Sequence, residues 1–190
     1  MRWDALFGDM EAQLDAEHLR ALESEISERA RVEAAGIGLS DRLRGAVDLK
    51  VTLVLRSGTL VSGALGHIGS EWLVLNEGRH EWLVPFAAVL SYQGLGRHAL
   101  SNPSKTASRL GLASALRGLA RDRAALSVHL HDGMAAERAM NGVIDKVGRD
   151  HFDLAVTAAG EPRRSGQVLS VATIPFASLV ALRSVRGQEF

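Results

Sequence analysis

Cysteine is absent from this 190-residue chain. Its absence excludes disulfides, thiolate zinc sites, iron–sulfur clusters and cysteine nucleophiles, and it suits a reducing compartment. Aromatic residues are also scarce, at 5% of the chain. Because 46% of the residues are nonetheless hydrophobic, we expect a folded protein whose core is built mainly from Val, Leu, Ile and Ala.

Long apolar runs are missing as well. The longest uncharged stretch, residues 165–182, contains Pro175 and several polar residues that a bilayer core would penalise. The first ten residues include Asp4 and Asp9 and do not resemble a signal peptide. We therefore expect a cytoplasmic protein with no membrane partner.

Motifs for catalysis are equally hard to find. The chain has neither a glycine-rich phosphate loop that leads from a strand into a helix nor a Gly-x-Ser-x-Gly elbow. His129 and His131, together with His151, have metal-binding chemistry, but an outward-facing strand surface explains them better. Two pairs of acids, Glu71 with Glu81 and Asp150 with Asp153, suit barrel rims and hairpins. We expect a non-enzymatic protein with no metal or cofactor.

The charges are balanced in total but segregated along the chain. Basic and acidic residues each number 22. Residues 1–36 contain nine acids against four arginines, a net charge of −5. Residues 97–123 contain six bases against one acid, a net charge of +5. An acidic N-terminal element and a basic middle segment are thus the two extremes of the chain.

An internal repeat organises the sequence. The block at residues 84–89, VPFAAV, recurs at 174–179 as IPFASL. Further blocks match in the same order: residues 43–45, 53–58, 63–65, 68–71 and 72–75 correspond to 116–118, 128–133, 142–144, 147–150 and 151–154. Several ordered blocks indicate two copies of one structural unit.

Each copy has the pattern of short β-strands. Val51, Leu53 and Leu55 alternate with their neighbours at a period of two. In the first copy we predict strands at residues 51–56, 59–68, 72–76, 80–84 and 89–93, with a 3₁₀ turn at 86–88 after Pro85. Five such short strands must curl to bury a core. We therefore predict a mainly β chain with flanking helices and two tandem five-stranded small barrels.

Helical patterns flank the two copies. Apolar spacing predicts a helix from Trp3 to about Ala34, with a slip near residues 17–18. Residues 101–104, SNPS, resemble a helix start, and Leu112, Leu116 and Leu119 form an apolar stripe after it. The predicted division is an acidic N-terminal helix at 1–38, a first barrel at 39–96, a basic helical linker at 97–123 and a second barrel at 124–190.

The order of these motifs resembles a known fold family. Gly63-Ala64-Leu65, Leu73-Val74-Leu75 and the Val84-Pro85-Phe86-Ala87-Ala88-Val89 block follow the strand order of the SH3-like small barrels. They are most similar to the Sm-like group, which includes a bacterial RNA chaperone. The tandem arrangement behind an acidic helix also resembles an actinobacterial protein family, and only three of the 22 basic residues are lysines, as GC-rich genomes favour. The resemblance implies a small-barrel fold and a nucleic-acid-binding class of function.

The basic middle segment is the first functional candidate. We expect it to bind RNA or single-stranded DNA because clustered positive charge alone gives non-specific affinity for phosphates. Trp72, Trp82 and Tyr92 are candidates for stacking surfaces beside it. The basic residues are Arg97, Lys105, Arg109, Arg117, Arg121 and Arg123. The alternative is a solvated helix face that pairs with the acidic N-terminal helix of the same chain.

The N-terminal helix supports a different class of function. Its apolar side chains begin with Trp3, Phe7, Met10 and Leu14, and such a stripe packs on the barrels, forms a coiled coil with a second copy or receives a partner protein. Exposed edge strands of small barrels also invite protein partners. The second hypothesis is therefore a protein-interaction or scaffold module. Salt distinguishes the two, because phosphate binding weakens with salt and apolar pairing does not.

Overall fold

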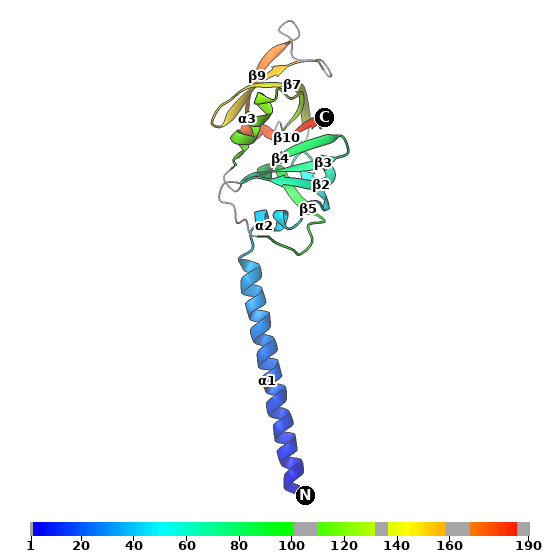
Figure 1. The fold of residues 1–190 in the computed structure, drawn as a ribbon, viewed down its shortest axis with the longest axis vertical. Coiled ribbons are helices and arrows are strands. Elements are labelled where there is room, and N and C mark those ends of the chain that lie inside the picture. The colour runs from blue at the N-terminus through cyan, green and yellow to red at the C-terminus, as the bar shows by residue number, and fades with distance from the viewer. Residues whose placement is uncertain (1, 101–109, 132–136, 159–167, 186–190) are drawn as a thin grey trace. The chain divides into compact units, whose positions relative to one another are not determined.

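The computed structural model describes residues 2–100, 110–131, 137–158 and 168–185, and it divides into two compact units at Gly38 (Figure 1). The first unit contains one helix, α1 (Arg2–Ala35), so the helix predicted in this region is confirmed. Gly36 ends it, with its N–H near the carbonyl groups of Val32 and Glu33. No helix in the described ranges is long and apolar enough to cross a bilayer.

The second unit is built on one antiparallel sheet of ten strands. The strands are β1 (Lys50–Leu55), β2 (Leu60–Ile68), β3 (Trp72–Glu77), β4 (His80–Pro85), β5 (Val89–Gln93), β6 (Leu126–His131), β7 (Glu137–Val147), β8 (His151–Val156), β9 (Ser170–Pro175) and β10 (Leu179–Val185). Two 3₁₀ turns, η1 (Phe86–Ala88) and η3 (Phe176–Ser178), follow the two repeated prolines. The mainly β prediction is confirmed, and the strands of the two predicted barrels join in one continuous sheet.

The strand order follows the sequence repeat. It runs β5-β1-β2-β3-β4 and then β10-β6-β7-β8-β9, so the second half of the sheet has the order of the first with β10 in the place of β5. The halves join where β4 pairs with β10, in a register that places Leu83 opposite Leu182 and Trp82 opposite Arg183. Two segments about a hundred residues apart in the chain thus form one ladder.

Each half of the sheet encloses its own hydrophobic core, and β4 and β10 contribute to both. Trp82 and Val84 of β4 lie in the first core with Val180 and Ala181 of β10. Leu83 of β4 lies in the second core with Leu179 and Leu182 of β10. Because neighbouring side chains on a strand point to opposite faces, the pair forms a wall that both cores share. We call β4 and β10 the shared wall.

Two short helices cover the cores at equivalent places in the repeat. Leu43 of α2 (Leu39–Arg44) is buried in the first core, and its repeat counterpart Leu116 of α3 (Leu112–Arg121) is buried in the second. Sequence analysis did not predict α2, which is only six residues long. The helix α3 begins after Gly111, whose backbone is extended, and the helix start predicted at residues 101–104 lies outside the described residues.

We expect Leu182→Ala in the shared wall to lower the free energy of unfolding by about 2–5 kcal/mol, because it removes a fully buried side chain and leaves a cavity. Leu90→Ala is the matched control, since Leu90 on the edge strand β5 is 64% exposed, and its effect should stay within about 0.5 kcal/mol. Urea unfolding of both variants measures the difference. Equal effects would contradict the shared wall.

Candidate nucleic-acid interface

Three of the predicted basic residues form an exposed group at α3. Arg117 and Arg121 lie one turn apart on the solvent side of the helix, whose opposite side buries Leu112 and Leu116. Arg123 lies two residues beyond Arg121 and is also exposed, with a left-handed φ of 50°. Lys105 and Arg109 lie outside the described residues.

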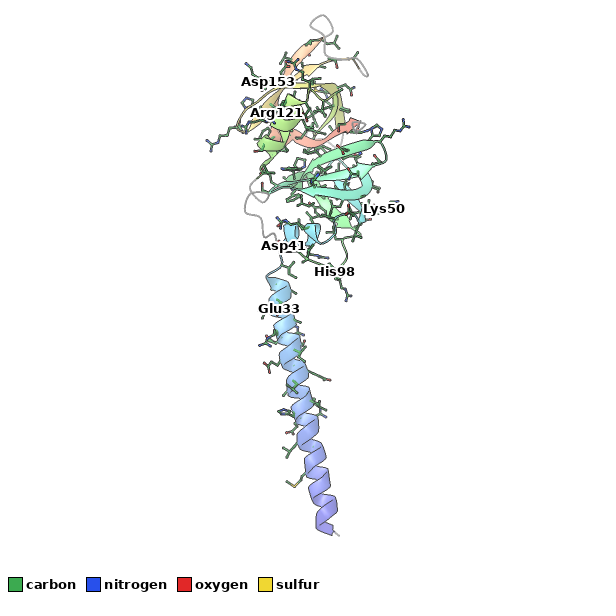
Figure 2. The ribbon with its side chains drawn as sticks, in the orientation of Figure 1. Glu33, Asp41, Lys50, His98, Arg121 and Asp153 are labelled. Atoms are coloured by element: carbon green, nitrogen blue, oxygen red, sulfur yellow. The ribbon has the colours of Figure 1, made fainter. Side chains whose placement is uncertain are left out.

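Arg97 belongs to a different part of the second unit. It is exposed and follows Gly96, whose carbonyl accepts a hydrogen bond from Nη2 of Arg42 beside α2, at 2.7 Å. Figure 2 shows its neighbour His98 at the α2 end of this unit and Arg121 on α3 in the other half. The basic segment is continuous in sequence, but its described residues do not gather on one surface.

Arg149 joins the α3 group, although sequence analysis did not select it. Nη2 of Arg117 lies 3.5 Å from the carbonyl oxygen of Gly148 in the β7–β8 turn, directly before the exposed Arg149. The packing of α3 on β7 brings the two segments together, and no local sequence pattern predicts this contact. We call Arg117, Arg121, Arg123 and Arg149 the α3 basic surface.

Two exposed acids border this surface: Asp122 lies between Arg121 and Arg123, and Asp150 follows Arg149. Oδ1 of Asp150 lies 2.8 Å from Nδ1 of His151 in the same turn. This hydrogen bond is the main reason that the pKa of Asp150 lies below its ordinary value. Asp150 therefore stays ionised at neutral pH and limits the basic surface on this side.

The N-terminus of α3 is already occupied by a side chain. Oε1 of Glu71 accepts a hydrogen bond from the backbone N–H of Leu112, at 2.9 Å. The N–H of Ser70 and Nε1 of Trp72 both donate to the carbonyl of Leu110. The β2–β3 turn of the first half thus positions a helix that packs in the second half, and a carboxylate satisfies the helix end that would otherwise attract an anion.

The two tryptophans predicted as stacking surfaces have different surroundings. Trp72 is half-buried, and its ring lies so close to Gly69 that a Cβ there would collide with it. Trp82 is only 7% exposed in the shared wall. Its Nε1 donates to Oε2 of Glu77, and its ring lies 5.1 Å from that of His129. Trp82 therefore offers no open face for a base.

The other candidates for chemistry are used elsewhere in the fold. His129 lies against Trp82, so the expectation that it faces solvent was wrong. Asp153 accepts a hydrogen bond from Oγ1 of Thr173, and Glu81 on β4 lines a small hollow beside Leu119. Within the described ranges, no three His, Asp or Glu side chains gather as a metal site would require.

Comparison with known proteins does not identify this arrangement: no protein-family model matches the chain, and neither does any curated protein. The candidate interface therefore depends on its geometry alone.

Tyr92 on β5 provides a direct test of burial at the first core. It is the single tyrosine of the chain, it packs against that core, and its hydroxyl is buried without a hydrogen-bond partner among the described residues. Burial raises the pKa of Tyr92 from 10.0 to about 12.

We expect the ultraviolet absorbance of the phenolate to appear with a midpoint near pH 12 in the folded protein. The unfolded chain loses this proton near pH 10.0 while the folded chain keeps it, so stability should fall as the pH rises between these values. A midpoint near pH 10.0 in the native protein would contradict the burial of Tyr92.

Proposed function

We propose that this chain is a non-enzymatic tandem of two SH3-like or Sm-like small barrels that binds RNA or single-stranded DNA through the α3 basic surface. The observation that carries the proposal is the exposure of Arg117, Arg121, Arg123 and Arg149. None of them pairs with a carboxylate among the described residues of the second unit. Unpaired guanidinium groups are free to contact phosphates.

The repeated strand order supports the two-barrel part of the proposal. Each half has five strands in the same order, its own buried core and a helix over that core. A small sheet with one enclosed core must curve around it. In this view the shared wall is the contact between two neighbouring small barrels.

The chemistry of the surface favours binding without strong sequence preference. Arginines bind phosphates by charge and by paired hydrogen bonds, and neither reads the identity of a base. Of the two predicted stacking tryptophans, only Trp72 has a partly exposed ring. Affinity should then come mainly from electrostatics and depend steeply on salt.

We expect Arg117→Glu, Arg121→Glu and Arg123→Glu together to weaken binding of a labelled mixed-sequence single-stranded RNA by at least about tenfold, because phosphate contacts become repulsive. Fluorescence anisotropy measures the affinity. Binding by the unchanged protein should also weaken strongly between about 50 mM and about 200 mM salt.

The matched control changes three exposed arginines of the first half, Arg42, Arg56 and Arg79, to Glu. It alters the net charge by the same amount but leaves the α3 basic surface intact. Equal losses in both variants would point to a general charge effect and contradict the location. Absence of binding by the unchanged protein at low salt would refute the nucleic-acid function itself.

A second function, protein interaction through α1, is favoured by one observation. Met10, Leu14, Leu19, Leu22 and Ile26 are between 44% and 68% exposed on this helix. Leu19, Leu22 and Ile26 follow helical spacing on one face, rotated from the face of Met10 and Leu14. The side chains of Trp3 and Phe7, also predicted for this role, lie outside the description. Exposed apolar stripes of this kind commonly contact a second copy of the helix.

If α1 pairs with a second copy, Ile26→Asp should dissociate the assembly, because it places a charge in the apolar stripe. Ser24→Asp, which lies on the opposite face of the helix, should leave it intact. Sedimentation velocity of the full chain at low and high salt reports the oligomeric state. A monomer at all salt concentrations, or equal effects of the two variants, would contradict self-pairing.

A further inference from the structure

A cleft, which we call the junction cleft, opens at one end of the shared wall. Its volume is about 270 Å³, and it is formed where β4 and β10 meet β6, β7 and the end of β8. Apolar atoms make up most of the lining surface, but six of the lining residues carry polar side chains: His80, Ser127, Asn141, Thr157, Arg183 and Ser184. The first half contributes His80, and the second half contributes the other five.

Arg183 carries the charge of this cleft and has no carboxylate to neutralise it. Its guanidinium donates from Nη2 to Nε2 of His80, at 2.9 Å, and lies 5.6 Å from the centre of the Trp82 ring. No carboxylate among the described residues pairs with it. A half-buried arginine that is held by an imidazole and an indole leaves a local positive potential.

One ring nitrogen of His80 has no hydrogen-bond partner among the described residues. Arginine can only donate, so Nε2 of His80 accepts, and the proton of the neutral ring must lie on Nδ1. Nδ1 is buried and has no hydrogen-bond partner among the described residues. An oxyanion would compete for the N–H of Arg183 and allow the imidazole to turn its own N–H toward the same ligand.

Acidic residues are missing from the lining. No Asp or Glu of the described chain borders the cleft. Glu77 belongs to the same network, but its carboxylate accepts the Nε1–H of Trp82 and does not line the cleft. Glu81, next to His80 on β4, lines a separate small hollow.

The repeat provides an internal comparison. The equivalent hollow of the first half is open and is lined by Lys50 together with two acids, Asp48 and Glu77. In the second copy, the corresponding surface has lost these charges and gained His80 and Arg183 from the shared wall. The two hollows lie at equivalent places in the repeat, since Ser62 and Gly63 correspond to Asn141 and Gly142, and their charged residues differ.

We propose that the junction cleft binds a phosphate group, either as free inorganic phosphate or as the terminal phosphate of a monoester. The guanidinium of Arg183, an N–H of His80, the amide of Asn141 and the hydroxyls of Ser127 and Ser184 supply donors from several directions, which suits a tetrahedral oxyanion with three terminal oxygens. The volume fits one such group and excludes a large ligand from full burial. Free phosphate and the 5′-phosphate of a nucleic-acid strand share this chemistry.

The test is an NMR titration of the full chain with inorganic phosphate at constant ionic strength. The indole N–H of Trp82, assigned with Trp82→Phe, reports on Arg183, and the backbone N–H of Ser127 and Asn141 reports on the cleft. We expect saturable shifts at these residues. Arg183→Gln should weaken binding by about tenfold or more, because the charge-assisted hydrogen bonds are lost.

A second variant tests the cleft while Arg183 and its contacts with His80 and Trp82 are retained. Ser127 lies opposite Arg183 in the β6–β10 register, so Ser127→Asp places a carboxylate beside the guanidinium and should block phosphate with Arg183 retained. Thr52→Asp, at the repeat-equivalent position in the first half, is the matched control and should bind normally. Shifts that do not saturate, or that persist in both Arg183→Gln and Ser127→Asp, would overturn the proposal.

A 5′-phosphorylated and a 5′-hydroxyl oligonucleotide, added to the variant with glutamate at positions 117, 121 and 123, distinguish the two sources. Shifts of the cleft residues with the phosphorylated strand alone would identify a strand end. Shifts with inorganic phosphate alone would identify a free small phosphate, and either result supports the site. Because the α3 basic surface is disabled in this variant, failure of the proposed RNA binding and failure of the cleft remain separate outcomes.

Discussion

The pairing of β4 with β10 is the contact on which the rest of the second unit depends. Both strands contribute residues to both cores, so Leu83 of the first half is buried in the second core and Val180 of the second half is buried in the first. Separation of the two strands would open both cores at once and expose apolar surface on each side. The halves therefore stabilise each other through shared side chains as well as through backbone hydrogen bonds.

The two copies of the repeat have diverged where this contact forms. Leu83 in the wall corresponds to Thr173 on β9, which is exposed and donates to Asp153. Val180 on β10 corresponds to Leu90 on β5, which is 64% exposed. The free edges of the sheet thus lack the side chains that bury the inner pair. The polar Thr173 on β9 disfavours burial of that edge, and the exposed Leu90 on β5 shows that the other edge buries no partner among the described residues of this unit, so the apolar inner pair forms the internal contact.

Local patterns predicted most of the elements and few of the contacts. Period-two alternation, glycine turns and the repeated proline located the strands, and helical spacing located α1, because these signals are short-range. The β4–β10 ladder joins segments far apart in the chain, and no local pattern specifies a partner strand. The same limit explains the error for Trp82, which the sequence predicted as a stacking surface and which is buried in the shared wall. It also explains Arg97, which lies beside α2 and apart from the other basic residues.

Both candidate sites depend on the joint between the halves, so neither would exist in a single copy of the repeat. Glu71 of the first half caps α3, which presents its arginines from the second half. His80 of the first half meets Arg183 of the second across the shared wall. The arginines differ in setting: those on α3 are exposed and act through screened charge, whereas Arg183 is half-buried and held against an indole. Exposed charge attracts a polyanion along its length, and a held guanidinium selects the orientation of one phosphate. The contact between the halves thus assembles each candidate site from residues of both copies of the repeat.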